Sequence, residues 1–249
     1  MEKLIKQMGV GSWITIGHPS VAEIMADAGF DWLCIDMEHT VIDYCQAQNL
    51  ISAIQGKGKL AYIRVGENNT RIIKRVLDAG ADGIIVPMVN TMEDAQRAVD
   101  AVRYPPEGKR GVGLARAQGY GFDFKKYLNK QKNIEIVLQI EHIDAINNLE
   151  SILAVDGING TIIGPYDLSA SMGKPGEFED DDVKEVLAEY EKISLELNMP
   201  MGYHIVEPDS KKFISMVDKG YTILALSFDA MYLGSIIREN LEKIKTALI

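Results

Sequence analysis

Short apolar segments alternate with helical patterns along the whole chain. Eight segments are short apolar runs, as buried parallel strands are. They cover residues 12–17, 32–38, 60–65, 83–89, 134–141, 160–165, 200–206 and 221–228. The stretches between them repeat apolar residues at helical spacing, and several end in a glycine suited to a helix C-cap, such as Gly29 and Gly80.

This alternation predicts an α/β fold. Eight strands joined by helices predict a (β/α)8 TIM barrel, and an open doubly wound sheet is the rival architecture. No linker rich in glycine, serine or proline interrupts the pattern, so we expect one domain over residues 1–249.

The composition of the chain limits which binding partners and which cellular location are expected. The chain has 36 acidic and 26 basic residues and a net charge of -10, which argues against nucleic acid and anionic membranes as partners. Cys34 and Cys45 are expected to be reduced thiols. The first eight residues lack the apolar stretch of a signal peptide, and no run is long enough to span a membrane. We therefore expect a soluble, cytoplasmic protein.

One stretch breaks the alternation. Residues 103–133 are longer than a helix and a turn require, which is typical of a lid or an interface segment. Gly111 and Gly113 begin like a dinucleotide fingerprint, but Arg116 stands at the third glycine position and no strand immediately precedes it. The pattern does not support a nucleotide site.

Polar residues lie at or just after the carboxyl ends of the predicted strands. In a parallel barrel they meet at one mouth, where the chemistry of such folds is located. They are Asp36, Glu38, His39, Arg64, Gln139, Glu141, Asp167, His204 and Asp229. Glu141 and Asp167 are the most informative pair, because two hard oxygen ligands beside Gly164 suit an octahedral divalent cation that keeps positions open for water and an oxo acid.

Single residues leave alternatives open at this point. His39 follows a carboxylate pair, which favours catalysis over a structural role. Arg64 could neutralise a buried carboxylate or bind an oxo acid. His204 could line the mouth or be buried. Asp78 lies in the last turn of a predicted helix, where its pattern alone indicates a structural residue.

Several strings resemble the class II, metal-dependent pyruvate aldolases, in particular 4-hydroxy-2-oxo-heptane-1,7-dioate aldolase and 2-dehydro-3-deoxyglucarate aldolase. The resemblance runs nearly from end to end. The strings are AGFDWLCIDMEH (28–39), VPMV (86–89), RYPPEGKRGVG (103–113), QIE (139–141) and GPYDLSASMG (164–173).

The resemblance implies a role for each matching residue. Glu141 and Asp167 are the implied metal ligands, and His39 is the implied base. Arg64 is implied to steady the developing oxyanion, and Asp78 to raise the basicity of His39, which replaces its structural interpretation. The remaining matches, implied to bind or surround the oxo acid, are Asp36, Gln139, Gly164, Tyr166 and Asp167. The family also implies a hexamer with a swapped C-terminal helix over residues 231–248.

The chain departs from the family pattern where the aldehyde should bind. Tyr166 and Met37 replace small residues, and the strings 113–121 and 202–208 differ. We expect the loop over residues 111–121 and the end of the seventh strand at His204 to lie on the mouth face, so Arg116 and His204 are the candidates for the aldehyde pocket. Arg116 could equally be a loop or interface residue.

The expected reaction joins pyruvate and an aldehyde, or cleaves a 4-hydroxy-2-oxo acid. Pyruvate would chelate Mg²⁺ or Mn²⁺, with Co²⁺ as a further candidate, and its carboxylate would take the backbone N–H groups of Tyr166 and Asp167. No lysine follows a strand where an imine-forming aldolase needs one. The alternatives are an oxaloacetate decarboxylase, a biosynthetic carbon–carbon ligase and a non-catalytic oxo-acid-binding protein.

Overall fold

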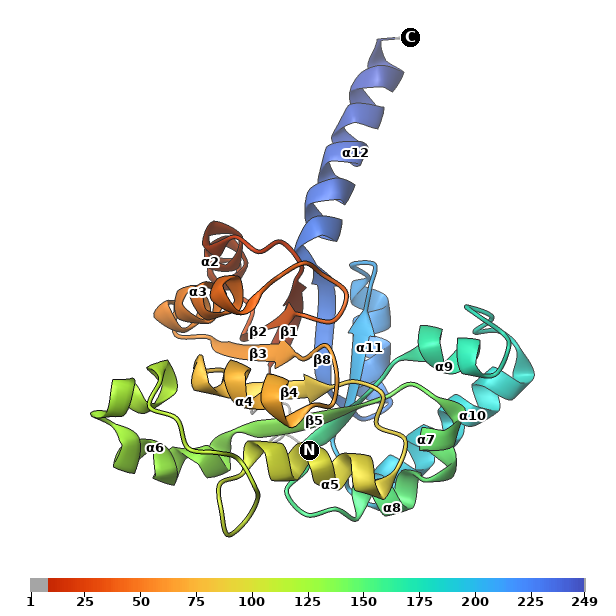
Figure 1. Cartoon of the computed structure of the whole chain (residues 1–249). Coiled ribbons are helices and arrows are strands. Elements are labelled where there is room, and N and C mark those ends of the chain that lie inside the picture. The colour runs from red at the N-terminus through yellow and green to blue at the C-terminus, as the bar shows by residue number, and fades with distance from the viewer. Residues whose placement is uncertain (1–8, 249) are drawn as a thin grey trace.

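The computed structural model describes residues 9–248 and shows a closed barrel of eight parallel strands, each hydrogen-bonded to its neighbours in chain order (Figure 1). The strands are β1 (Val10–Ile14), β2 (Trp32–Asp36), β3 (Leu60–Arg64), β4 (Gly83–Val86), β5 (Glu135–Ile140), β6 (Gly160–Ile163), β7 (Met201–Ile205) and β8 (Tyr221–Phe228). The predicted (β/α)8 barrel is confirmed, and the open sheet is excluded. The prediction about the first eight residues lies outside the described part of the chain.

Helices alternate with the strands, and all but the last, α12, lie in the connections between one strand and the next. They are α2 (Pro19–Asp27), α3 (Tyr44–Gly56), α4 (Thr70–Asp78), α5 (Met92–Val102), α6 (Phe124–Lys130), α7 (Ile143–Asn147), α8 (Leu149–Leu153), α9 (Pro165–Ser171), α10 (Asp181–Glu196), α11 (Ser210–Asp218) and α12 (Asp229–Ala247). Short polar side chains accept hydrogen bonds at several helix starts, such as Asp43 before α3 and Asn69 before α4. Gly29 and Gly80 follow their helices with positive φ values of 111° and 106°, as the C-cap pattern predicts.

Successive side chains of each strand point alternately into the barrel and toward the helices, so the core has two layers. In β2, Trp32 and Cys34 belong to the cluster inside the barrel, whereas Leu33 and Ile35 pack against the surrounding helices. The inner cluster also contains Tyr62 from β3 and Val137 from β5. The next inward position toward the carboxyl end of each of these three strands is polar. These positions are Asp36, Arg64 and Gln139. The packed interior is therefore the floor of a polar site.

The final helix leaves the barrel. Figure 1 shows α12 running away from the closed sheet. Its apolar side chains are about half exposed; they are Leu233, Ile236, Ile237, Leu241 and Ile244. At its start, the buried Asp229 carboxylate accepts hydrogen bonds from Thr15 N and Ile16 N at 2.9 and 2.8 Å. Asp229 thus fixes the end of β1 to the base of the helix.

Candidate active site

Arg64 is the centre of a charged cluster at the carboxyl end of the barrel. Asp36 and Arg64 are partners in the β2–β3 register, so their side chains project from adjacent strands at the same height. Arg64 donates to both Asp36 oxygens, from Nε at 2.9 Å and from Nη2 at 2.7 Å. Its third nitrogen, Nη1, lies 3.2 Å from Glu38 Oε2. The guanidinium is thereby held in one orientation by two carboxylates.

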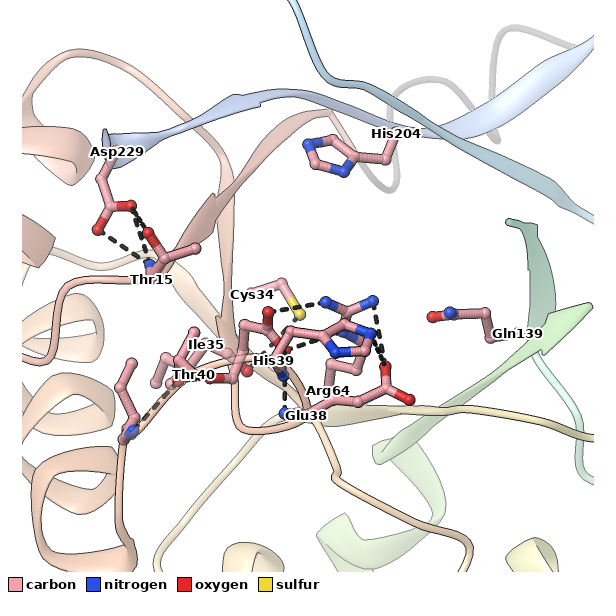
Figure 2. Close-up of polar contacts among 12 residues, drawn as sticks. Thr15, Cys34, Ile35, Glu38, His39, Thr40, Arg64, Gln139, His204 and Asp229 are labelled. Carbon is pink, nitrogen blue, oxygen red and sulfur yellow. Dashed lines mark hydrogen bonds and ion pairs between the residues drawn. The ribbon is translucent and has the colours of Figure 1, made fainter. Parts of the chain in front are cut away.

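Asp36 also shapes the loop that carries the histidine. Its Oδ1 accepts hydrogen bonds from the backbone N–H groups of Glu38 and His39, at 3.0 and 3.3 Å. The His39 side chain is 66% exposed, and its Nε2 lies 3.6 Å from Glu38 Oε2 (Figure 2). Glu38 therefore links His39 to Arg64. The sequence placed Glu38 at a strand end but gave it no role, because only the side-chain geometry reveals this link.

Glu141 is buried beside the turn that carries Asp167. Met88 N donates to Glu141 Oε1 at 2.7 Å, and the Gln139 amide donates to Oε2. Burial raises the pKa of Glu141, and the Asp167 charge adds to this effect. A Cβ at Gly164 would lie 2.9 Å from Glu141 Cβ and 3.1 Å from Oε2. A larger residue at this position would press against the Glu141 side chain, whereas glycine leaves Oε2 uncovered.

A cavity of about 440 Å³ opens at this end of the barrel. Its wall includes the predicted residues Arg64, Gln139, Gly164, Tyr166, Asp167 and His204. The Tyr166 ring packs edge-on against Phe178 at 4.8 Å between centroids. Trp13 from β1 is a wall residue that was not among the predicted site residues, and the Arg64 guanidinium lies 4.4 Å from the centroid of its ring. Alternation of side chains along β1 places Trp13 inside the barrel, and this alternation is the sequence feature that could have indicated its position.

The charges of the cluster do not balance. Asp36, Glu38, Glu141 and Asp167 supply four carboxylates, whereas Arg64 supplies one fixed positive charge. Burial raises the pKa of Glu38 to about 7; Arg64 opposes this shift, and the Glu141, Asp36 and Asp167 charges add to it. A divalent cation between Glu141 and Asp167 would offset this excess charge. The donor set therefore fits a hard metal ion.

The protein ligands of such an ion would be few. Within residues 9–248, no three His, Cys, Asp or Glu side chains converge into a metal-binding group. Glu141 and Asp167 would hold the ion as a pair and leave its other positions to water and substrate oxygens.

His204 stands on the wall of the cavity. Its Nε2 lies 3.1 Å from the Ser227 carbonyl oxygen, and its ring lies 5.2 Å from the Trp13 ring between centroids. Burial lowers the pKa of His204 to about 4; the Ser227 carbonyl opposes this shift, and the nearby Arg64 charge adds to it. Of the two alternatives for His204, this position agrees with a residue that lines the mouth of the barrel.

Arg116 does not lie at the mouth of this chain. Its guanidinium donates to the Ala79 carbonyl at 3.0 Å and to Gln55 Oε1 at 2.9 Å. Ala79 immediately follows α4 and precedes β4, so this contact is at the amino-terminal end of the barrel. The prediction that the 111–121 loop shares the mouth face is therefore wrong within one chain. The segment instead forms a 3-10 helix, η1 (Arg116–Gly121), followed by α6 and η2 (Gln131–Asn133).

Asp78 is also far from the mouth. It is the last residue of α4, and it accepts hydrogen bonds from Arg110 Nη2 at 2.7 Å and from Gln118 Nε2 at 3.1 Å. Because α4 begins after β3 and runs back along the barrel, its last turn lies at the opposite end from His39. Within one chain, the structure does not bring Asp78 to the base that it was predicted to support.

Residues 10–235 match the family described as HpcH/HpaI aldolase/citrate lyase. The chain belongs to this family. It is 39% identical over 228 residues to the hydroxypyruvate/pyruvate aldolase of Roseobacter denitrificans, covering 90% of this chain and 88% of that protein. It is 34% identical over 226 residues to the 5-keto-4-deoxy-D-glucarate aldolase of Escherichia coli, covering 90% and 87%.

A solved HpcH/HpaI aldolase/citrate lyase family structure from Burkholderia cenocepacia has a TM-score of 0.91 and 30% identity, with 98% of each chain covered. The resemblance predicted from the sequence is confirmed, and this HpcH/HpaI family member is a carbon–carbon lyase of the aldolase type. No helix in the described range is both long and apolar enough to cross a membrane.

Proposed function

We propose that this aldolase is divalent-metal-dependent and joins pyruvate to an aldehyde, or cleaves the corresponding 4-hydroxy-2-oxo acid. The observation that carries the proposal is the unbalanced cluster of carboxylates around Arg64, next to a cavity large enough for an oxo acid and a small aldehyde. Glu141 and Asp167 are the proposed ligands, and Mg²⁺ or Mn²⁺ suits their oxygen atoms, with Co²⁺ as a further candidate. When bound, the cation would supply Lewis-acid polarisation of the keto group.

The residues of the chain have distinct roles in this proposal. The backbone N–H groups of Tyr166 and Asp167, at the start of α9, would receive the pyruvate carboxylate, since Pro165 has no N–H to give. Gln139 donates a hydrogen bond to Glu141 and would keep the Glu141 carboxylate oriented beside the oxo acid. Arg64, held by Asp36, would stabilise the negative charge that develops on the substrate oxygen during bond cleavage.

His39 is the proposed base for the proton on the aldehyde oxygen. Its exposed ring would act through a bound water. Glu38, at 3.6 Å, is the carboxylate that this chain places next to it. Because Asp78 lies at the other end of the barrel, an effect of Asp78 on His39 would require Asp78 from a second subunit.

The relatives bear on the substrates. One is named for hydroxypyruvate and pyruvate, the other for a keto-deoxy sugar acid, so an oxo-acid donor and a small or sugar-derived aldehyde are the proposed partners. A cytoplasmic location fits such metabolites. Self-association through the exposed side of α12 is proposed as well, with a second copy of this chain as the partner and a hexamer as the assembly that the family resemblance implies.

The deciding experiment follows exchange of the pyruvate methyl protons in D₂O by NMR, together with aldol turnover, with and without Mg²⁺ or Mn²⁺. Metal-dependent exchange and aldol formation support the proposal, and the absence of both contradicts it. Faster release of pyruvate from oxaloacetate than from hydroxy-oxo acids would favour a decarboxylase. Lys212 lines the cavity, so borohydride treatment with pyruvate is a useful control. A trapped adduct would indicate an imine route instead.

A further inference from the structure

The protonation of the His204 ring is fixed by its partner. His204 Nε2 lies 3.1 Å from the Ser227 carbonyl oxygen, which can only accept a hydrogen bond. The proton is therefore on Nε2. Ser12 Oγ lies 3.0 Å from the same carbonyl oxygen and 2.9 Å from the Leu226 carbonyl oxygen, and its one proton is shared between them. This contact ties the Ser227 carbonyl to β1.

The ring is also fixed in orientation. It packs against Trp13 at 5.2 Å and against Phe228 at 6.4 Å between centroids. Turning the imidazole over would break its bond to Ser227 and place a C–H group against the carbonyl oxygen. The identities of the two nitrogens are thereby settled by packing and hydrogen bonding together.

The second nitrogen, Nδ1, is an acceptor. Burial lowers the pKa of His204 to about 4, so the imidazole is neutral near pH 7 and Nδ1 keeps its lone pair. Among the described residues, Ser227 is the hydrogen-bond partner of this side chain, and Nδ1 receives none. Figure 2 shows the His204 ring across an open space from the Arg64 guanidinium and Gln139, and all three residues line the same cavity.

The position of this acceptor relative to the oxo acid follows from strand register. Tyr203 pairs with Ile163, so His204 stands alongside Gly164, where the proposed pyruvate site begins. Neighbouring strands are about 4.8 Å apart. A substituent on a substrate bound at Gly164 is thus within reach of His204. An acceptor at this position would repel a carboxylate and would be satisfied by a hydroxyl group.

We propose that His204 Nδ1 accepts a hydrogen bond from a substrate hydroxyl and makes the enzyme selective for hydroxylated substrates. The inference rests on the proposed aldolase function and specifies the substrate class for it. The hydroxyl is carried either by the carbon next to the aldehyde group or by C3 of the oxo-acid donor. In both cases the same lone pair recognises it. A substrate that lacks the hydroxyl leaves the acceptor unpaired, which is how a polar site rejects a deoxy analogue.

The test compares hydroxylated and deoxy substrates in two arms. In the aldehyde arm, glycolaldehyde is compared with acetaldehyde, and pyruvate is the oxo acid in both reactions. In the oxo-acid arm, hydroxypyruvate is compared with pyruvate, and both react with one common aldehyde. His204→Phe keeps an aromatic ring against Trp13 but removes the acceptor. We expect it to lower the ratio of kcat/KM for the hydroxylated over the deoxy substrate by about tenfold in one arm, which identifies the source of the hydroxyl.

Three controls make the result decisive. His204→Gln restores an acceptor oxygen and should recover part of the ratio. Met231→Leu changes an apolar residue of the same cavity wall and should leave the ratio as in the native enzyme. In ¹⁵N-histidine-labelled native enzyme, the Nδ1 resonance should shift with the hydroxylated compound and not with its deoxy partner.

Two failures are distinguishable. If His204→Phe keeps both native ratios while pyruvate exchange and aldol turnover proceed, His204 does not read a hydroxyl and this inference is overturned. If the native enzyme neither exchanges pyruvate protons nor turns over any pair, the proposed function itself fails, and the inference fails with it.

Discussion

Asp36 binds Arg64 through both carboxylate oxygens, at 2.9 and 2.7 Å, and is only 3% exposed. The same Oδ1 that accepts from the Arg64 Nε also accepts from two backbone N–H groups of the loop that carries His39. One buried carboxylate therefore sets the orientation of the arginine and the path of the histidine loop together. Asp36 thereby positions Arg64 from β3 and the backbone of the loop that follows β2.

Removal of this carboxylate should affect more than charge. We expect Asp36→Ala to lower kcat by at least about 10²-fold, because both Arg64 and the His39 loop lose their anchor. Asp36→Asn keeps an oxygen for the loop and should be less severe. Steady-state kinetics, with circular dichroism to establish folding, measure both variants. Equal loss in the two would show that the charge alone matters.

The metal proposal predicts the behaviour of two conservative variants. Glu141→Gln and Asp167→Asn should each abolish EDTA-sensitive activity while the barrel remains folded, because each removes one of two proposed protein ligands. Isothermal titration with Mn²⁺ should show loss of binding. Glu207→Gln, at another carboxylate of the same cavity wall, is the matched control. Native Mn²⁺ affinity in either ligand variant would refute the assignment.

His39 and Arg64 should differ in which half of the reaction they support. His39→Ala should strongly reduce aldol cleavage but retain part of the pyruvate methyl exchange, whereas Arg64→Ala should suppress both, since the arginine faces the developing oxyanion. NMR exchange rates and aldol kinetics on the same preparations separate the two effects. Native cleavage rates in His39→Ala would mean that another group is the base.

The lowered pKa of His204 predicts a pH-dependent stability. Its folded pKa of about 4 lies below the usual 6.5, so between these values the unfolded chain binds the proton more strongly. The free energy of unfolding should therefore fall as the pH falls from 6.5 to 4, with a contribution from His204 of up to about 3 kcal/mol. Urea unfolding across this range should show a smaller fall for His204→Phe. An identical fall in both proteins would contradict the shift.

The exposed side of α12 predicts self-association. The double variant Ile237→Lys, Leu241→Lys places charge where a second copy is expected to pack, and it should reduce the oligomer to smaller species. Glu242→Lys introduces the same charge at a polar position of the helix and is the control. Light scattering after gel filtration measures the mass. Native protein that is already monomeric would exclude the assembly.

The sequence predicted the barrel because strand and helix periodicity recur eight times in order. It also predicted which polar residues meet, because the carboxyl ends of parallel strands share one end of a barrel. This reasoning places Glu141 and Asp167 together without any knowledge of side-chain conformation. The bidentate bond between Arg64 and Asp36 required the structure, since alternation gives only the face of each residue.

The 111–121 loop was misplaced for a different physical reason. A long segment without strand periodicity carries no signal for the end of the barrel to which it returns, and the contacts of Arg116 with Ala79 and Gln55 decide this. The position of Asp78, by contrast, could have been predicted from the sequence. As the last residue of a helix that follows a strand, it has to lie at the amino-terminal end of the barrel.

The two tryptophans of the chain lie at different depths of the barrel. Trp32 packs against Tyr62 in the interior, with ring centroids 5.5 Å apart, whereas Trp13 faces the Arg64 guanidinium and the cavity. We expect a molecule in the cavity to change the polarity around Trp13, which lines it, and to leave Trp32 in its buried packing against Tyr62. The enzyme therefore contains its own optical probe: in a Trp32→Phe chain, the fluorescence emission arises from one indole that stands on the wall of the proposed substrate site.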